Sequence, residues 1–216
     1  MSRELHPATL AGTRLDRYFH TCAFFRGADE QYRVLGPFIA EGLEGGEKAL
    51  HFCDSKLCDD HLTRLAGCGI DVRGCVDRGL LDVLSWEESY LVDGRFDADR
   101  MIATVQATCK KGEEDGYPRL RIIGHMGWAL EGHPGSEQLI EYEVRVNEVL
   151  SRWRQPAICV YDLDQLSGTM MMDILRTHPL TLVGGVVYEN PFYTPAEQLL
   201  EELAAKAGRS SAAPSA

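Results

Sequence analysis

The sequence predicts a three-layer α/β fold, in which helices cover both faces of a mostly parallel β-sheet. Short apolar runs alternate along the chain with longer amphipathic stretches, which is the pattern of strands joined by crossover helices. Several of these runs are almost entirely apolar, as strands buried on both faces are. The 216 residues and the 44% hydrophobic content suffice for one domain with a full core.

Six strands are predicted from the apolar runs, at residues 18–24, 48–53, 80–84, 119–123, 157–161 and 182–187. The amphipathic stretches predict helices at residues 29–43, 56–66, 97–112, 136–153 and 163–176, the last interrupted at Ser167-Gly168. Asp29 is expected to cap the first helix, and Pro37 to kink it. Pro195 is expected to open a sixth helix.

The two ends of the chain are small and polar, with little to bury. The sequence therefore predicts a flexible arm at residues 1–13, a single folded domain at residues 14–203 and a disordered tail at residues 204–216.

Composition limits the partners that the chain can have. Lys and Arg number 22 against 33 Asp and Glu, and the net charge of -11 would repel a phosphate backbone. No apolar run approaches the roughly 20 residues of a membrane-spanning helix. The seven cysteines are an odd number, and the first residues do not resemble a signal peptide. We expect a cytoplasmic protein with reduced cysteines that binds neither nucleic acid nor membrane.

Residues able to do chemistry gather where the predicted strands end, the edge at which open α/β sheets bind their ligands. Two predicted strands end in a His-x-Cys pair, and others run into GHMGW and Tyr-Asp. The sequence therefore predicts a small-molecule site at this edge. Its expected ligand-binding residues are His20, Cys22, His51, Cys53, Asp54, His125, Trp128, Tyr161 and Asp162.

The two His-x-Cys pairs also suggest an alternative, a metal-based or thiol-based redox sensor. Side chains two apart on a strand share a side, so His20 lies with Cys22 and His51 with Cys53. We expect both pairs to face one crevice. Two histidines and two cysteines suit tetrahedral zinc or a softer metal, but the spacing matches no zinc module. A metal ion is therefore an alternative cofactor rather than an assigned one.

Structural roles compete with these functional ones. Cys22 and Cys53 would serve equally as small buried hydrophobic residues, and the histidines as partners of backbone groups. Trp128 would either line the floor of a ligand pocket or belong to the core. Asp162 would either act as an acidic residue of the site or cap the next helix. The other cysteines are interpreted as packing residues: Cys58, Cys68, Cys75, Cys109 and Cys159.

The common enzyme motifs are absent from the sequence. The segment GLEGGEK lacks the spacing of a phosphate-binding loop and precedes a strand rather than a helix. There is no G-x-S-x-G, H-E-x-x-H or strand-following G-x-G-x-x-G. A Cys-His nucleophile would lack an oxyanion hole. We therefore expect a protein that is not an enzyme, and a degenerate NTPase-like enzyme is the third choice.

Six segments together resemble the MEDS family, the methanogen/methylotroph sensory domains. They are His20-x-Cys22, PFIAEGLEGGEKALHFCD, GHMGWAL, EYEVRVNEVL, CVYDLDQLSG and RTHPLTLVGGVVYENPFY. The resemblance covers residues 14–203, and its last segment is the most specific. The matching motif residues are His20, Cys22, Gly42, Asp54, Trp128, Tyr142, Tyr161, Asp162, Arg176, Thr177, His178, Pro179, Asn190 and Pro191.

This resemblance implies a RecA/KaiC-like core that has lost its phosphate loop and serves as a sensory module for small hydrocarbon-derived molecules. The chain departs from the family at His125, where many relatives carry an acidic residue. It also shows no kinase or helix-turn-helix module, so the expected output passes through a regulatory partner (a kinase or transcription regulator) or a homodimer. The RTHP and GGVVYENPFY motifs would couple the site to that output or simply pack on the sheet edge.

Overall fold

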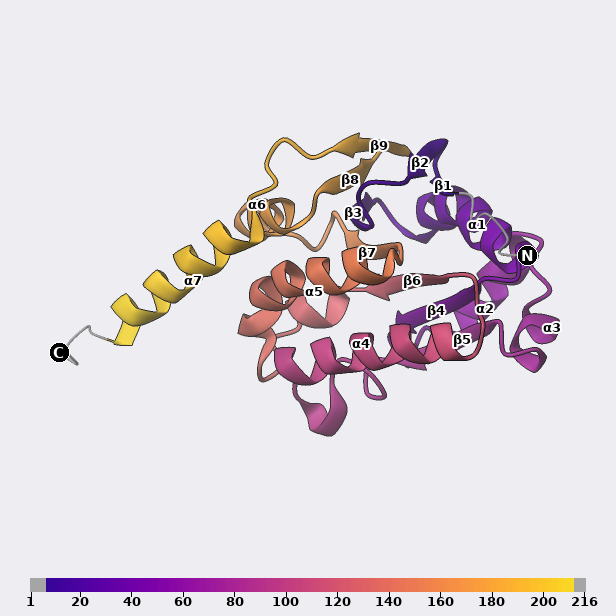
Figure 1. Ribbon diagram of the computed structural model, residues 1–216, viewed down its shortest axis with the longest axis horizontal. Helices are drawn as coiled ribbons and strands as arrows, with labels where there is room; N and C mark the ends of the chain where they lie inside the picture. The colour runs from indigo at the N-terminus through magenta and orange to yellow at the C-terminus, as the bar shows by residue number, and fades with distance from the viewer. Residues whose placement is uncertain (1–6, 212–216) are drawn as a thin grey trace.

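A seven-stranded sheet forms the centre of the computed structural model, which describes residues 7–211 (Figure 1). The strands lie in the order β5-β4-β6-β7-β3-β8-β9, and all are parallel except β9. Their bounds are β3 (His20–Phe25), β4 (Lys48–Cys53), β5 (Leu81–Ser85), β6 (Leu120–His125), β7 (Ala157–Asp162), β8 (Leu180–Val183) and β9 (Val186–Glu189). The predicted mostly parallel α/β sheet is confirmed.

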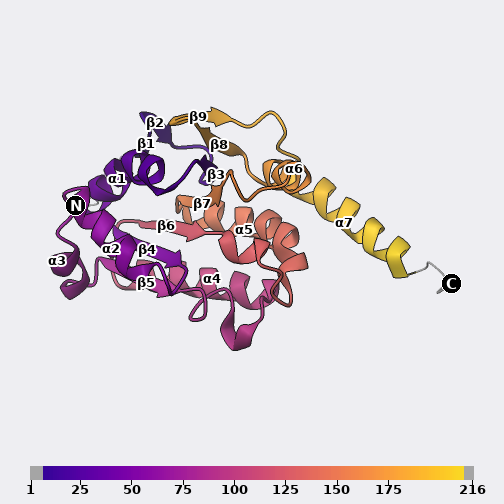
Figure 2. The same cartoon turned by 180° about the vertical axis from the view of Figure 1, so that it is seen from behind.

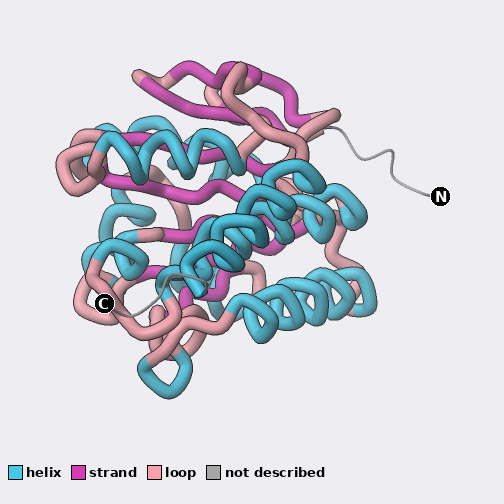
Figure 3. The backbone as a smooth tube through the Cα atoms, turned by 90° about the vertical axis from the view of Figure 1, so that its left-hand side faces the viewer, coloured by secondary structure: helices cyan, strands magenta, loops and turns pink. Residues whose placement is uncertain are grey.

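Helices cover both faces of the sheet (Figure 3). One face carries α1 (Ala28–Glu44), α2 (Cys58–Gly67) and α3 (Val72–Asp77), and the other carries α4 (Ala98–Glu114), α5 (Leu139–Trp153) and α6 (Gly168–Thr177). We call these the α1–α3 face and the α4–α6 face. Within the described residues, no helix has the length and apolar character needed to cross a membrane.

Side chains of each strand alternate between two separate hydrophobic cores. In β3, Cys22 and Phe24 belong to the core under the α4–α6 face, whereas Ala23 and Phe25 belong to the core under the α1–α3 face. In β4, Leu50 likewise packs under α4–α6. Within a strand, even-numbered and odd-numbered residues therefore point to opposite faces of the sheet.

The predicted flexible arm is wrong for most of its length. Strands β1 (Ala8–Leu10) and β2 (Thr13–Leu15) form an antiparallel hairpin that packs on the α1–α3 face, and Leu10 is fully buried. The strands are only three residues long, too short for their alternation to stand out in the sequence. Residues 1–6 of the predicted arm lie outside the described residues.

The predicted disordered tail is also wrong over most of its length. Helix α7 (Ala196–Ser211) begins after Pro195, as expected, and continues beyond residue 203. It is anchored by buried Leu199 and by an ion pair of 2.7 Å between Arg176 and Glu202, and it then extends away from the sheet (Figures 1 and 2). Residues 212–216 lie outside the described residues.

The last predicted strand is in fact two strands. Gly184 and Gly185 have φ angles of 58° and 77° and form the turn between β8 and β9, with Val183 paired to Val186. Two successive positive φ angles are what a tight hairpin turn requires and what glycine permits. The predicted break at Ser167 is the helix start, where its hydroxyl accepts the Met170 amide hydrogen and caps α6.

Helix α1 runs through Pro37 and approaches strand β6 closely at Gly42. A Cβ atom at Gly42 would lie 2.5 Å from Nε of Arg121. Arg121 has no room to move, because its guanidinium donates to Glu47 at 2.5 Å, to Glu41 at 2.8 Å and to the carbonyl of Phe38. This buried ion cluster explains the glycine at position 42.

Substituting Gly42→Ala should therefore lower the free energy of unfolding by about 1–3 kcal/mol in urea denaturation. The steric cost exceeds the gain of about 1 kcal/mol in helix propensity. Gly67→Ala is the matched control, because a Cβ at this helix end meets nothing within 4 Å. Equal stability of the two variants would show that the contact with Arg121 is not tight.

Candidate functional site

The carboxyl edge of the sheet carries a pocket of about 250 Å³. It is formed by the first turn of α1 and by the segments that follow β3, β4, β5, β6 and β7. Its lining residues are Phe25, Gly27, Ala28, Gln31, Asp54, Leu57, Trp86, His125, Gly127, Leu130, Glu131, Val160, Tyr161, Asp162 and Gln165. We call it the strand-end pocket.

Four of the predicted ligand-binding residues line this pocket: Asp54, His125, Tyr161 and Asp162. Trp128 does not, because it is fully buried in an aromatic cluster with Tyr90 and Phe96. The interpretation of Trp128 as a core residue is therefore the correct one.

The pocket combines apolar walls with acidic and amide groups. Asp54, Glu131 and Asp162 are among its lining residues, and no Lys or Arg is. The Asp162 carboxylate accepts the Asp164 amide hydrogen and that of the Gln165 side chain, both at 3.0 Å, so it holds the turn after β7. This electrostatic environment disfavours anionic ligands.

Acidic side chains oppose a phosphate where a phosphate-binding loop would place it. In such loops the anion meets free amides at the start of the helix that follows the first core strand. Here that start belongs to α1, and the amide of Arg26 already donates to the Glu30 carboxylate at 2.8 Å. Asp29 adds a second negative charge to the same turn.

The prediction that the two His-x-Cys pairs face one crevice is wrong. His20 is the first residue of β3, at the amino edge, and its side chain contacts Asn147 of α5. His51 lies in the middle of β4, and its Nδ1 is 2.8 Å from Nε2 of His61 in α2. Because even-numbered residues of both strands face α4–α6, the odd-numbered His51 points the opposite way.

The cysteines of these pairs are equally far from forming one site. Cys22 donates to the carbonyl of Leu180 at 3.6 Å, whereas Sγ of Cys53 lies 2.7 Å from Sγ of Cys58 on the other face. Burial raises the pKa of Cys22 to about 12 and also raises that of Cys53, which makes both poor thiolate nucleophiles. A metal or redox site built from His20, Cys22, His51 and Cys53 is therefore excluded.

His51 belongs to a chain of neutral groups buried under the α1–α3 face. Nδ1 of His61 lies 2.5 Å from the Tyr32 hydroxyl, and Nε2 of His61 reaches His51. Burial lowers the pKa of His61 to about 4 and that of His51 well below its usual value. The His61 ring also lies edge-on to His125, whose Nε2 is 3.2 Å from the Gln31 amide at the strand-end pocket.

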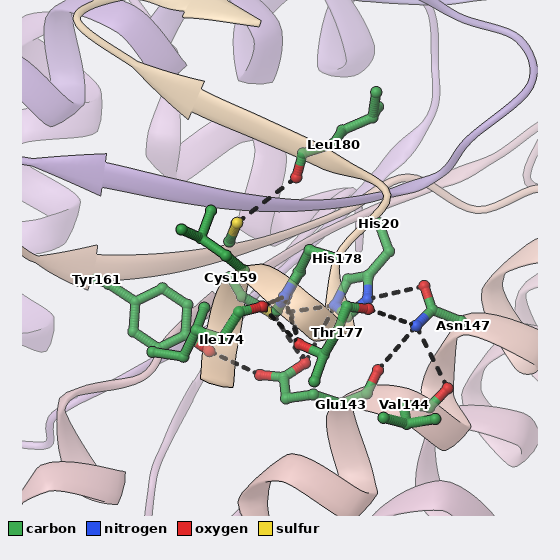
Figure 4. A network of polar contacts seen from close by, with 12 residues as sticks. His20, Glu143, Val144, Asn147, Cys159, Tyr161, Ile174, Thr177, His178 and Leu180 are labelled. Carbon is green, nitrogen blue, oxygen red and sulfur yellow. Dashed lines mark hydrogen bonds and ion pairs between the residues drawn. The ribbon is translucent and has the colours of Figure 1, made fainter. Parts of the chain in front are cut away.

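On the opposite face, four chemically versatile side chains converge (Figure 4). His20, Glu143, Cys159 and His178 are all buried and come from β3, α5, β7 and the end of α6. Oε2 of Glu143 lies 3.2 Å from Nε2 of His20, 3.5 Å from Nε2 of His178 and 3.6 Å from Sγ of Cys159. We call this group the buried polar centre.

A second layer of hydrogen bonds orients the buried polar centre (Figure 4). Tyr161 donates to Oε1 of Glu143 at 2.8 Å, and the Oδ1 atom of Asn147 lies 3.2 Å from Nδ1 of His20. Nδ1 of His178 lies 2.9 Å from the carbonyl of Ile174. Burial is the main cause that lowers the pKa of His178 to about 3, so this ring is neutral.

The RTHP and GGVVYENPFY motifs meet beside this centre. The side chain of Asn190 donates to the carbonyls of Leu175 at 2.6 Å and His178 at 2.8 Å. Arg176 donates to Thr194 at 3.2 Å. The two motifs therefore hold the backbone that carries His178.

Sequence reasoning missed three members of this centre as site residues. Glu143 lies on the apolar stripe of its helix, four residues after Leu139, and a carboxylate at such a position is itself an indication of a buried site. Cys159 was interpreted as packing, although its position two residues before Tyr161 places both side chains on one face. His178 was recognised only as a family motif residue.

Comparison with known proteins gives a family match and a curated relative. Residues 19–179 match the family model that is described as the methanogen/methylotroph, DcmR sensory domain. A curated relative, the transcriptional repressor DcmR of Methylorubrum extorquens, is 23% identical over 170 residues. That match covers 78% of this chain and 61% of the repressor, so the chain spans about three fifths of its relative.

Two solved structures from Pyrococcus horikoshii share the fold. The KaiC-like protein PH0186 superposes with a TM-score of 0.56 at 12% identity, over 83% of this chain and 79% of its own. The uncharacterized protein PH0321, solved with an unknown peptide, gives a TM-score of 0.57 at 14% identity, over 79% and 78% of the two chains. The RecA/KaiC-like fold is thereby confirmed, and these identities are too low to transfer a function.

Proposed function

Because the chain belongs to the MEDS family of sensory domains, we propose that it detects a small molecule in the strand-end pocket and passes the binding event to a regulatory protein. The observation that carries this proposal is the pocket itself, at the edge where open α/β sheets bind ligands. Loops from five strands meet there, so a ligand would contact several independently movable segments at once.

The size and charge of the pocket favour a small neutral or cationic ligand. Its volume of about 250 Å³ lies below the roughly 300–1,000 Å³ of pockets for drug-sized molecules. The carboxylates of Asp54 and Glu131 oppose anions, and Trp86, Leu130 and Val160 offer apolar contacts. Gln31 and His125 would supply the directional hydrogen bonds.

The same features argue against nucleotide chemistry. The carboxylate of Glu30 accepts from the Arg26 amide before the start of α1, and the pocket lining adds negative charge. We therefore propose that the domain binds rather than converts its ligand, and that it neither binds nor hydrolyses ATP.

A regulatory partner completes the proposal. The relative DcmR is named a transcriptional repressor. We propose that the output acts on a separate kinase or transcription regulator, or through a homodimer. We also propose that the chain itself does not bind DNA, because its net charge of -11 repels the phosphate backbone.

Gln31→Ala should weaken binding of small ligands about tenfold, the effect of one lost hydrogen bond of roughly 1–1.5 kcal/mol. The ligands are first found by ligand-observed NMR with a panel of small neutral and cationic organic molecules. Their affinities are then measured through the fluorescence of Trp86, which lines the pocket and donates to the carbonyl of His125 at 2.8 Å.

The control is Gln106→Ala, which removes an exposed glutamine from α4, away from the pocket. Ligands that bind this variant and the Gln31→Ala variant equally well do not use the strand-end pocket. Micromolar affinity for ATP in calorimetry would contradict the proposal as well.

A further inference from the structure

Hydrogen bonds show which ring nitrogen of each histidine in the buried polar centre carries a hydrogen. The Nδ2 group of Asn147 donates to the carbonyls of Glu143 at 3.0 Å, Val144 at 3.3 Å and Thr177 at 2.8 Å. Its Oδ1 atom can therefore only accept, and the hydrogen shared with His20 must belong to Nδ1 of the ring. When the ring is neutral, Nε2 of His20 therefore carries a lone pair.

The same reasoning applies to His178. Its Nδ1 faces the carbonyl oxygen of Ile174 at 2.9 Å, and a carbonyl cannot donate. Nδ1 therefore carries the hydrogen, and Nε2 of His178, which has no hydrogen-bond partner among the described residues, also presents a lone pair. Each Nε2 atom lies close to Oε2 of Glu143, at 3.2 Å for His20 and 3.5 Å for His178.

With both rings neutral, acceptor atoms outnumber donors at the middle of the centre. Two imidazole nitrogens and a carboxylate oxygen meet there, and the thiol of Cys159 supplies one hydrogen for all of them. Tyr161 already donates to the other carboxylate oxygen, Oε1. Buried acceptors that face one another are costly unless a cation lies between them.

We propose that the buried polar centre binds one divalent transition-metal ion, of which zinc is the best match, through Nε2 of His20, Oε2 of Glu143, Sγ of Cys159 and Nε2 of His178. Four of the six distances between these ligand atoms are 3.2–3.6 Å, and all four atoms lie within 4.8 Å of one another. Zinc bonds of about 2.0–2.3 Å at tetrahedral angles place their ligand atoms about 3.3–3.6 Å apart. The site is thus nearly preformed.

The charge of the ligands and the hydrogen bonds behind them agree with a metal. Cys159 would bind as a thiolate and release its proton to solvent, so that one thiolate and one carboxylate neutralise a divalent ion in this buried site. Asn147 and the carbonyl of Ile174 accept from the other ring nitrogens of the two histidines and orient them, as the hydrogen-bond partners of metal-bound histidines do. Four protein ligands leave no open position, which is typical of a structural rather than a catalytic zinc.

None of the four proposed ligands lines the strand-end pocket. One ion bound to them would hold β3, β7, α5 and the end of α6 together. Tyr161 connects the two places, because it lines the pocket and donates to Glu143.

The test uses the untagged full chain, stripped with a chelator, and titrates it with Co(II) and then with Zn(II). We expect one Co(II) per chain, the intense visible bands of four-coordinate cobalt, a thiolate-to-cobalt charge-transfer band and displacement of cobalt by one equivalent of zinc. Cys159→Ala should abolish the charge-transfer band. Asn147→Ala, which removes the contact that orients His20 but leaves all four ligand side chains in place, should weaken zinc binding about 10–100-fold.

Cys58→Ser is the matched control, because it removes the thiol of the separate Cys53–Cys58 pair. The cobalt spectrum should survive this change. The proposal fails if the folded wild-type chain shows no charge-transfer band, or if that band disappears in Cys58→Ser. The wild-type titration decides the matter by itself if Cys159→Ala does not fold.

Discussion

Replacing Trp128 by alanine should lower the free energy of unfolding by about 3–5 kcal/mol, the usual cost of deleting a large buried aromatic side chain. Trp128 is fully buried, stacks on Tyr90 with ring centroids 5.1 Å apart and contacts Phe96 at 4.5 Å. The loss would leave a void at the centre of the α4–α6 core, and urea denaturation followed by circular dichroism measures it.

Trp153→Ala is the matched control for this experiment. Trp153 lies at the end of α5, is only partly buried and packs against the exposed Arg152 at 4.9 Å. Its removal should cost clearly less than that of Trp128. A loss below about 1.5 kcal/mol for Trp128→Ala would mean that this segment is not part of the core and would reopen its assignment to a ligand site.

The fold was largely predictable because burial on both faces makes a parallel strand nearly apolar. The runs that contain Ile122, Ile158 and Leu182 all became strands of the main sheet. The errors fall where local chemistry replaces periodicity, as at Gly184-Gly185, where two glycines turn the chain and divide one apolar run into two strands. The hairpin of β1 and β2 carries no such indication beyond the Gly12 turn.

The sites were less predictable. They depend on which face of the sheet each strand residue points to, and on which distant segments of the chain come together. Asp54 and Asp162 could be placed at the carboxyl edge, because Asp54 directly follows an apolar strand and Asp162 ends one. His20 and His51 could not be assigned to faces without knowing where β3 begins and which parity in β4 faces α5. No local pattern shows that α5 would bring Glu143 to the strand residue His20.

Two of the described clusters lie back to back across the sheet. The chain of His51, His61 and Tyr32 is under α1–α3, and the buried polar centre is under α4–α6. Each reaches the strand-end pocket through one side chain, since the His61 ring contacts His125 and Glu143 accepts from Tyr161. A ligand that displaced either lining residue would therefore disturb a buried network beneath it, which gives the pocket a physical route to the rest of the fold.

Acidification should destabilise the protein through His61, by about 3 kcal/mol between pH 7 and pH 4. Burial lowers the pKa of His61 in the folded state to about 4, against about 6.5 in the unfolded chain. Between these values the unfolded state holds a proton that the folded state lacks, so stability falls as the pH drops from about 6.5. Below pH 4 both states are protonated, and this contribution changes no further.

Comparing the wild type with His61→Gln isolates this term, because glutamine can replace the hydrogen bonds to Tyr32 and His51 but does not titrate. The difference in unfolding free energy between the two proteins, measured in urea at pH 7, 6, 5 and 4, should shift by about 3 kcal/mol in favour of the variant. His133→Gln, which removes a partly exposed histidine from the loop after β6, serves as the control for losing one histidine outside the buried network. If the wild type and His61→Gln keep a constant difference over this range, His61 is not held neutral in the folded protein, and the buried histidine chain is not the closed network that its hydrogen bonds indicate.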